Sequence, residues 1–148
     1  MSAGEFSSMK VFIDTNIMID FLENRQPFAE DAIRIFELSA LTQIELYISD
    51  LTIANVRYIT HKKISLNKFY QAMKSLQNYI HITSVGEMAV HRAIQIEARD
   101  FEDALQYFSA EYAGVDVIVT RNISDYYFAT LPILTPSEFL NQSPAYRR

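Results

Sequence analysis

The amino-acid sequence predicts an α/β fold, a three-layer α/β/α sandwich with a mainly parallel central sheet. Short apolar segments alternate along the chain with longer segments whose apolar residues recur at helical spacing. This alternation favours a parallel sheet with helices on both sides, because each crossover between parallel strands is usually a helix. At 148 residues, of which 49% are hydrophobic, the chain suits one domain with a substantial core.

The strands and helices follow one another in a regular order. The predicted strands cover residues 10–13, 46–48, 80–82, 115–120 and 132–134. The predicted helices cover about residues 16–23, 28–41, 50–61, 66–79, 87–98, 101–114 and 136–141. Pro27 suits the start of the second helix. Ser84 with Glu87, and Asp100 with Asp103, have the spacing of a capping box and predict two further helix starts.

Composition and chain ends limit the class of protein. We interpret residues 1–8 as a flexible lead or cloning remnant, residues 9–141 as the domain, and residues 142–148 as a frayed C-terminus. Charges interrupt every apolar run, and no signal peptide is recognisable, so no membrane association is expected. The absence of cysteine excludes a disulfide framework, a thiolate zinc site and a cysteine nucleophile, and it fits a cytoplasmic protein.

Three acidic residues stand at the ends of predicted elements. Asp14 follows the first strand, Asp103 lies at the start of a helix, and Asp125 follows the fourth strand. Sites in open α/β sheets gather beyond the carboxyl ends of the strands, so these carboxylates are expected to share one pocket. Unpaired carboxylates in one pocket are costly unless a hard cation neutralises them, and Mg²⁺ or Mn²⁺ is the usual one.

Each acidic residue also has a purely structural interpretation. Asp14 could cap the helix that follows it, Asp100 and Asp103 could form only a capping box, and Asp125 could be a turn residue. Asp20 and Asp116 are expected to be solvated or to cap helices. The occurrence of all three acidic sites together, each in a suitable strand or helix context, favours the metal site.

Charge is unevenly distributed along the chain. The net charge is −5, yet residues 51–86 contain no Asp or Glu and carry +5. The remainder carries −10, since it holds 8 of the 13 basic residues and all 18 acidic ones. The basic residues of the stretch are Arg57, Lys62, Lys63, Lys68 and Lys74. They predict a basic face beside the acidic pocket, the alternative being an ordinary solvated helical face.

Four stretches, residues 11–16, 100–104, 119–125 and 134–140, together resemble the PIN domain family of metal-dependent ribonucleases. The resemblance covers nearly the whole chain, from Met9 to about Leu140. It implies the three-layer fold, an acidic site for Mg²⁺ or Mn²⁺, and cleavage of RNA phosphodiesters by an endoribonuclease. Many bacterial members are toxins of toxin–antitoxin pairs, so the resemblance also implies an antitoxin protein as partner and a homodimer.

By motif position, Asp14, Asp103 and Asp125 match three of the family's four acidic residues and are the implied catalytic residues and metal ligands. The implied supporting residues are Thr15, Asn16, Asn55, Asp100, Thr120 and Asn122. RNA phosphates are expected to bind Lys62, Lys63, Lys68 and Arg121, which would position the strand without reading its sequence.

The second acidic position departs from the family pattern. Most PIN nucleases have Glu where this chain has Asn55, and an amide brings no charge. Asp100 or Asp50 is a candidate to supply the missing charge. The departure keeps open a non-catalytic PIN-like module that binds RNA or protein. A phosphotransferase of the haloacid-dehalogenase type is disfavoured, because its chemistry needs a second Asp where Asn16 stands.

Overall fold

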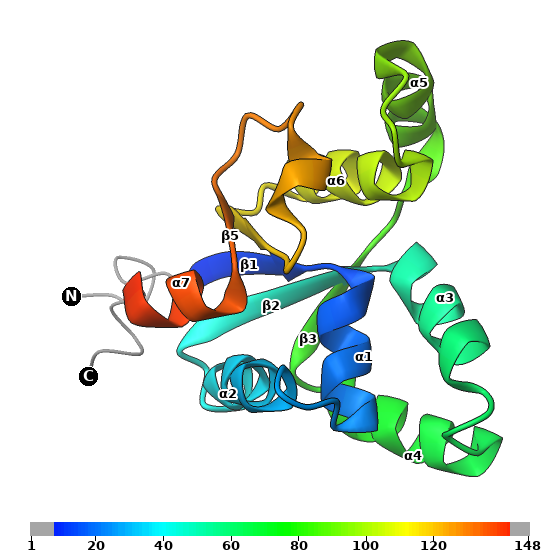
Figure 1. Cartoon of the computed structure of the whole chain (residues 1–148), viewed down its shortest axis with the longest axis vertical. Coiled ribbons are helices and arrows are strands. Elements are labelled where there is room, and N and C mark those ends of the chain that lie inside the picture. The colour runs from blue at the N-terminus through cyan, green and yellow to red at the C-terminus, as the bar shows by residue number, and fades with distance from the viewer. Residues whose placement is uncertain (1–7, 143–148) are drawn as a thin grey trace.

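The computed structural model describes residues 8–142 and confirms the predicted α/β fold, with a central sheet in which all five strands are parallel (Figure 1). The strand order is β3-β2-β1-β4-β5. Predictions for residues 1–7 and 143–148 lie outside the described range. Ser8, at the N-terminal limit of that range, donates a hydrogen bond from its hydroxyl to the Thr42 carbonyl, 3.1 Å away.

The strand order places a topological switch point between β1 and β4, near the centre of the sheet. The strands are β1 (Met9–Ile13), β2 (Ile44–Ser49), β3 (Ile80–Thr83), β4 (Val117–Val119) and β5 (Ile133–Leu134). From β1 the chain adds β2 and β3 on one side, and then β4 and β5 on the other. The carboxyl ends of β1 and β4 therefore flank the topological switch point, where open parallel sheets bind their ligands.

Helices cover both faces of this sheet. They are α1 (Thr15–Glu23), α2 (Ala29–Ala40), α3 (Asp50–Thr60), α4 (Leu66–Leu76), α5 (Gly86–Ile96), α6 (Phe101–Ala113) and α7 (Pro136–Gln142), with a 3₁₀ helix, η2 (Ile123–Tyr126). Helices α5 and α6 lie on one face, and α1, α2 and α4 on the other (Figure 1). In residues 8–142 no helix is both long enough and apolar enough to cross a bilayer.

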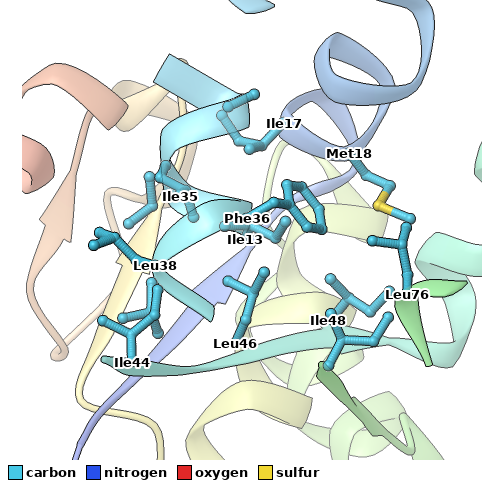
Figure 2. Packing of buried hydrophobic residues seen from close by; sticks show 14 of the residues in the cluster. Ile13, Ile17, Met18, Ile35, Phe36, Leu38, Ile44, Leu46, Ile48 and Leu76 are labelled. Atoms are coloured by element: carbon cyan, nitrogen blue, oxygen red, sulfur yellow. The ribbon is translucent and has the colours of Figure 1, made fainter. Parts of the chain in front are cut away.

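Strand β1 shows why the core has two halves. Val11 and Ile13 point into the cluster formed with α1, α2 and α4, whereas Phe12 points into the cluster formed with α5 and α6. This follows from the two-residue period of a strand. In the first cluster, Phe36 of α2 packs over the sheet near Ile13 and Met18 (Figure 2). Both faces of β1 are covered, as expected for a central parallel strand.

The structure corrects some predicted helix starts. The capping box of Ser84 and Glu87 is wrong, because α5 begins at Gly86 after Val85, which provides no side-chain cap. Gly86 has a φ of 72°, and the Val85 N–H donates to Asp50 Oδ1 at 3.3 Å. Helix α2 begins at Ala29, two residues after Pro27. The predicted cap of α6 is correct, since Asp100 Oδ1 accepts the Asp103 N–H at 3.0 Å.

Candidate active site

Asp14 occupies the switch point between β1 and β4. It follows β1 directly, caps α1 and is only 4% exposed. Its Oδ1 accepts the backbone N–H of Ile17 at 3.3 Å, and its Oδ2 accepts the hydroxyl of Thr120 at 2.6 Å. The capping interpretation of Asp14 is therefore correct, and it is compatible with a site, because one carboxylate oxygen faces the end of β4.

Thr120 joins the two central strands at their carboxyl ends. Its hydroxyl donates to Asp14 and accepts the Asn122 N–H at 3.0 Å. The predicted supporting residue Thr120 thus fixes both the Asp14 carboxylate and the backbone that leads to Asp125. Asn122 takes part through its backbone, and its side chain is exposed. Asn16 lies half-buried in the first turn of α1.

The start of α6 lies at the same edge of the sheet as Asp14. The pKa of Asp103 is raised from 3.8 to about 7, mainly by burial, and the charges of Asp100, Asp14 and Asp125 contribute to this rise. The charges of Asp14, Asp100 and Asp125 therefore all act on the Asp103 carboxyl group. Carboxyl groups whose pKa values are raised in this way are expected at a functional site.

The pKa of Asp14 is also raised, from 3.8 to about 6. Burial is the main cause, and it outweighs the hydrogen bonds from Thr120 and Ile17 and the charge of Arg121, which all lower the pKa. Desolvation disfavours the charged form of a carboxyl group, and the shift measures that cost. In the part of the chain that the structure describes, no three Asp, Glu or His side chains lie close enough to hold one ion.

Tyr126 is a residue of this site that the sequence analysis missed. It is buried in η2, and its hydroxyl donates to Asp103 Oδ1 at 3.4 Å. Burial raises its pKa, with contributions from the charges of Asp14 and Asp103. Its position directly after Asp125 is the only sign in the sequence that it belongs to the site. That position alone does not distinguish a site residue from a turn residue or an aromatic residue of the core.

Asn55 and Asp50 have different surroundings from those that the sequence suggested. Asn55 Nδ2 donates to Glu102 Oε2 at 3.0 Å, so a carboxylate from α6 stands beside the second acidic position. Asp50 instead accepts the backbone N–H groups of Leu51 and Val85. Of the two candidates for the missing charge, the charge of Asp100 acts on Asp103, whereas Asp50 is bonded to backbone N–H groups. The sequence analysis missed Glu102.

A buried polar network holds α6 against the ends of β1 and β2. Thr52 Oγ1 donates to Gln106 Oε1 at 3.2 Å, and Gln106 Nε2 donates to Thr15 Oγ1 at 3.1 Å. Ser49 Oγ donates to Thr52 Oγ1 at 3.1 Å, and the Thr15 and Thr52 hydroxyls are 3.2 Å apart. Gln106 follows Asp103 by one helical turn, and Thr15 follows Asp14. The network therefore fixes the two acidic residues relative to each other.

A second buried cluster corrects the predictions for Asp20 and Arg121. Asp20 is not solvated but 0% exposed. Arg25 Nε and Arg121 Nε each donate to one of its carboxylate oxygens at 2.8 Å, and Arg121 Nη2 donates at 3.2 Å. The Arg121 guanidinium also lies 3.8 Å from the centroid of the Phe28 ring. Arg121 thus anchors the segment after β4 to α1, instead of presenting its guanidinium to RNA as predicted.

The predicted basic face lies away from the acidic residues. Lys63 Nζ is 3.7 Å from Glu23 Oε1, at the C-terminal end of α1, whereas Asp14 caps the N-terminal end. The nine residues of α1 separate the two ends by about 13 Å. Lys62 and Lys68 are exposed near Lys63 in the chain. Arg57 donates to the Ile64 carbonyl, so part of the basic stretch stabilises the α3–α4 connection.

Removing the Asp14 charge should change how stability depends on pH. The raised pKa means that native Asp14 binds its proton more tightly than the unfolded chain does. Its stabilising contribution is complete below about pH 4 and is lost as the pH rises through about 6. Without divalent metal, the free energy of unfolding of Asp14→Asn should therefore increase by about 2–3 kcal/mol relative to that of wild type as the pH rises from 4 to 7.5. Urea denaturation in a chelator measures this gain.

Asp116→Asn is the matched control for that prediction, because Asp116 is exposed and lies at the opposite end of the sheet. Its carboxylate accepts the Lys10 N–H at 2.8 Å. Parallel stability profiles of Asp14→Asn and wild type across this pH range would contradict the prediction.

Removing the Asp20 carboxylate should destabilise the fold. Asp20→Asn leaves two guanidinium groups without their buried counter-charge, and we expect a loss of about 3 kcal/mol in the free energy of unfolding. The urea midpoint should fall with an unchanged m-value. Glu30→Gln, an exposed change on α2, is the control and should leave the midpoint where it is. A midpoint for Asp20→Asn equal to the control would show that the cluster is dispensable.

Comparison with known proteins agrees with this fold. Residues 10–124 match the PIN domain family. Ribonuclease VapC1 of Aquifex aeolicus (strain VF5) is 28% identical over 138 residues, which cover 90% of this chain and 94% of that protein. DNA-bound VapBC from Salmonella typhimurium has a TM-score of 0.66 at 20% identity, covering 86% of this chain and 98% of that one.

A toxin–antitoxin complex from Klebsiella pneumoniae has a TM-score of 0.63 at 23% identity, covering 85% of this chain and 97% of that one. These solved structures share the α/β fold described above. The family match spans most of the chain and includes both strands that flank the switch point. This protein belongs to the PIN domain family.

Proposed function

We propose that this protein is a Mg²⁺- or Mn²⁺-dependent endoribonuclease that hydrolyses RNA phosphodiesters and acts as the toxin of a toxin–antitoxin pair. One observation carries the proposal: Asp14 is buried at the switch point, and its charge and those of Asp100 and Asp125 all raise the pKa of Asp103. Carboxylates gathered in this way favour a site for a divalent ion.

The donor set fits a hard cation. Asp14, Asp103 and Asp125 would hold it, and all three offer only oxygen atoms. Within residues 8–142 no three such side chains lie close enough to hold one ion directly, so at least one of these carboxylates would have to bind it through a water molecule, as is usual for Mg²⁺. When bound, such an ion supplies an activated water and stabilises charge on the leaving oxygen.

The residues around the carboxylates orient them and control their protons. Thr120 holds one oxygen of Asp14, Tyr126 holds one oxygen of Asp103, and Asp100 fixes the first turn of α6. Asp14 and Asp103 must lose their protons before they can act as ligands. With pKa values of about 6 and about 7, both do so close to neutral pH, and cleavage is expected to increase over that range.

The relatives support the biological role. Similarity to a ribonuclease VapC1 extends over 90% of this chain, and chains of the same fold occur in toxin–antitoxin complexes. An antitoxin protein is therefore the proposed partner and RNA the proposed substrate. The homodimer implied by the family resemblance remains a prediction.

A non-catalytic RNA- or protein-binding module is the second candidate. Asn55 favours it, because an amide stands at the second acidic position and donates to Glu102 instead of adding a charge. Glu102, however, brings a carboxylate to the same place. An activity measurement separates the two candidates.

Cleavage should require divalent metal and Asp14. Wild type should cut a fluorogenic single-stranded RNA with Mn²⁺ and not with a chelator, and Asp14→Asn should be at background. Thr120→Val should lower the rate about 10- to 100-fold, because it removes the hydroxyl that orients Asp14. The control Asp116→Asn should retain wild-type activity. If Asp14→Asn cleaves as fast as wild type, the assignment of the site is wrong.

Divalent metal should stabilise the folded protein. A ligand that binds only the native state at about 100 times its Kd adds about 2.7 kcal/mol to the free energy of unfolding. Mn²⁺ should therefore raise the Tm of wild type and of Asp116→Asn, and it should raise that of Asp14→Asn much less. Equal Tm shifts in all three proteins would count against Asp14 as a ligand.

A further inference from the structure

We propose that Arg99 and Tyr127 form a binding surface for single-stranded RNA at the edge of the acidic site. We call these two side chains the Arg99–Tyr127 pair. The inference rests on the proposed function, since it names side chains that present the RNA strand to that site.

The Arg99–Tyr127 pair joins two segments that are far apart in the sequence. Arg99 lies in the connection between α5 and α6, and Tyr127 directly follows η2. The Arg99 guanidinium lies 4.7 Å from the centroid of the Tyr127 ring, and its Nη2 donates to the Ser124 carbonyl at 3.2 Å. Tyr127 is nevertheless 56% exposed, so the arginine orders the ring without burying it.

Each residue of this contact is next to a residue of the acidic site. Arg99 precedes Asp100, and Ser124 precedes Asp125. Tyr127 follows Tyr126, whose hydroxyl donates to Asp103. Consecutive Cα atoms are 3.8 Å apart, so the backbone of the pair adjoins the backbone of these residues of the acidic site.

Charge favours RNA as the occupant of this surface. A polyanion that approaches four carboxylates needs a cation beside them to hold the neighbouring phosphates. Lys63 is at the other end of α1, and Arg121 is bound to Asp20. Arg99 is exposed, and its guanidinium donates to the carbonyl of Ser124, the residue before Asp125.

Exposed apolar side chains near the pair provide a surface on which RNA bases can stack. Phe101, which follows Asp100, is 47% exposed, and Ile123 is exposed at the start of η2. Unstacked RNA bases stack on aromatic rings and on arginine planes, and such contacts tolerate many sequences. The pair therefore offers a phosphate contact and a stacking surface together, which suits single-stranded RNA better than a duplex.

RNA binding by an inactive full-length protein tests the proposal. In an Asp14→Asn background, fluorescence anisotropy with a short fluorescein-labelled single-stranded RNA gives the Kd without cleavage. Tyr127→Leu should raise the Kd about tenfold or more, whereas Tyr127→Phe should not change it. Arg99→Gln should raise the Kd and lower the steepness of log K against log salt by about 0.7, the loss of one phosphate contact.

Tyr112→Leu is the matched control, because Tyr112 is also an exposed tyrosine, 49% accessible, but lies near the C-terminal end of α6. It should bind RNA as the parent does, and all variants should keep their Tm within the range of the control. In the active enzyme, Tyr127→Leu should raise KM and leave kcat nearly unchanged, which a merely structural role would not do.

The outcomes separate this inference from the proposed function. An unchanged Kd in Tyr127→Leu and Arg99→Gln, an equal loss in Tyr112→Leu, or a parent that does not bind the RNA at low salt would overturn it. If the Kd of both variants is unchanged, a protein partner becomes the better candidate for binding at this surface. Weakened binding in both variants of a chain that never cleaves RNA would support the surface and contradict the nuclease proposal.

Discussion

The hydrogen bond between the Thr120 hydroxyl and the Asp14 carboxylate is the interaction on which the rest of the site depends. It connects the carboxyl ends of β1 and β4, the two strands on either side of the switch point. Asp14 is buried with a carboxyl group whose charged form is disfavoured, so it needs donors on both oxygens. Thr120 and the Ile17 N–H supply them, and the second of these is an ordinary helix cap.

The acidic site lowers the stability of the folded protein, and a nearby network of hydrogen bonds offsets this loss. Burial raises the pKa of Asp14 and of Asp103, which means that both cost stability when they are ionised. The network around Gln106 holds α6 in place, although its acidic first turn faces Asp14. A buried network of hydrogen bonds thus supports carboxylates that repel one another. Such a loss of stability is common at functional sites.

Two buried carboxylates of this protein have different kinds of partner. Asp20 occupies two arginines inside the fold and fixes the segment between β4 and η2. Asp14, only six residues earlier, has no direct cationic partner among its hydrogen bonds. The difference is one of position, because Asp20 bonds to Arg25 just beyond the C-terminal end of α1, whereas Asp14 stands at the carboxyl end of β1, at the switch point of the sheet.

The sequence determined the fold class, the order of the elements and the acidic residues at their ends. Local chemistry controls all three, since strand and helix periodicity and capping act over a few neighbouring residues. The capping by Asp100 was predictable for the same reason. Even the failure at Ser84 is local in origin, because Gly86 starts α5 in a left-handed conformation that the capping pattern ignores.

Only the tertiary structure decided which partners these residues have. Arg121 bonds to Asp20 across 101 positions, and Asn55 meets Glu102 across 47, so no local pattern indicates either contact. Tyr126 enters the site because η2 turns its hydroxyl toward Asp103. Spacing along a chain fixes which residues share a helix turn or a strand face, whereas contacts between distant segments depend on how the layers pack, and packing is a property of the whole chain.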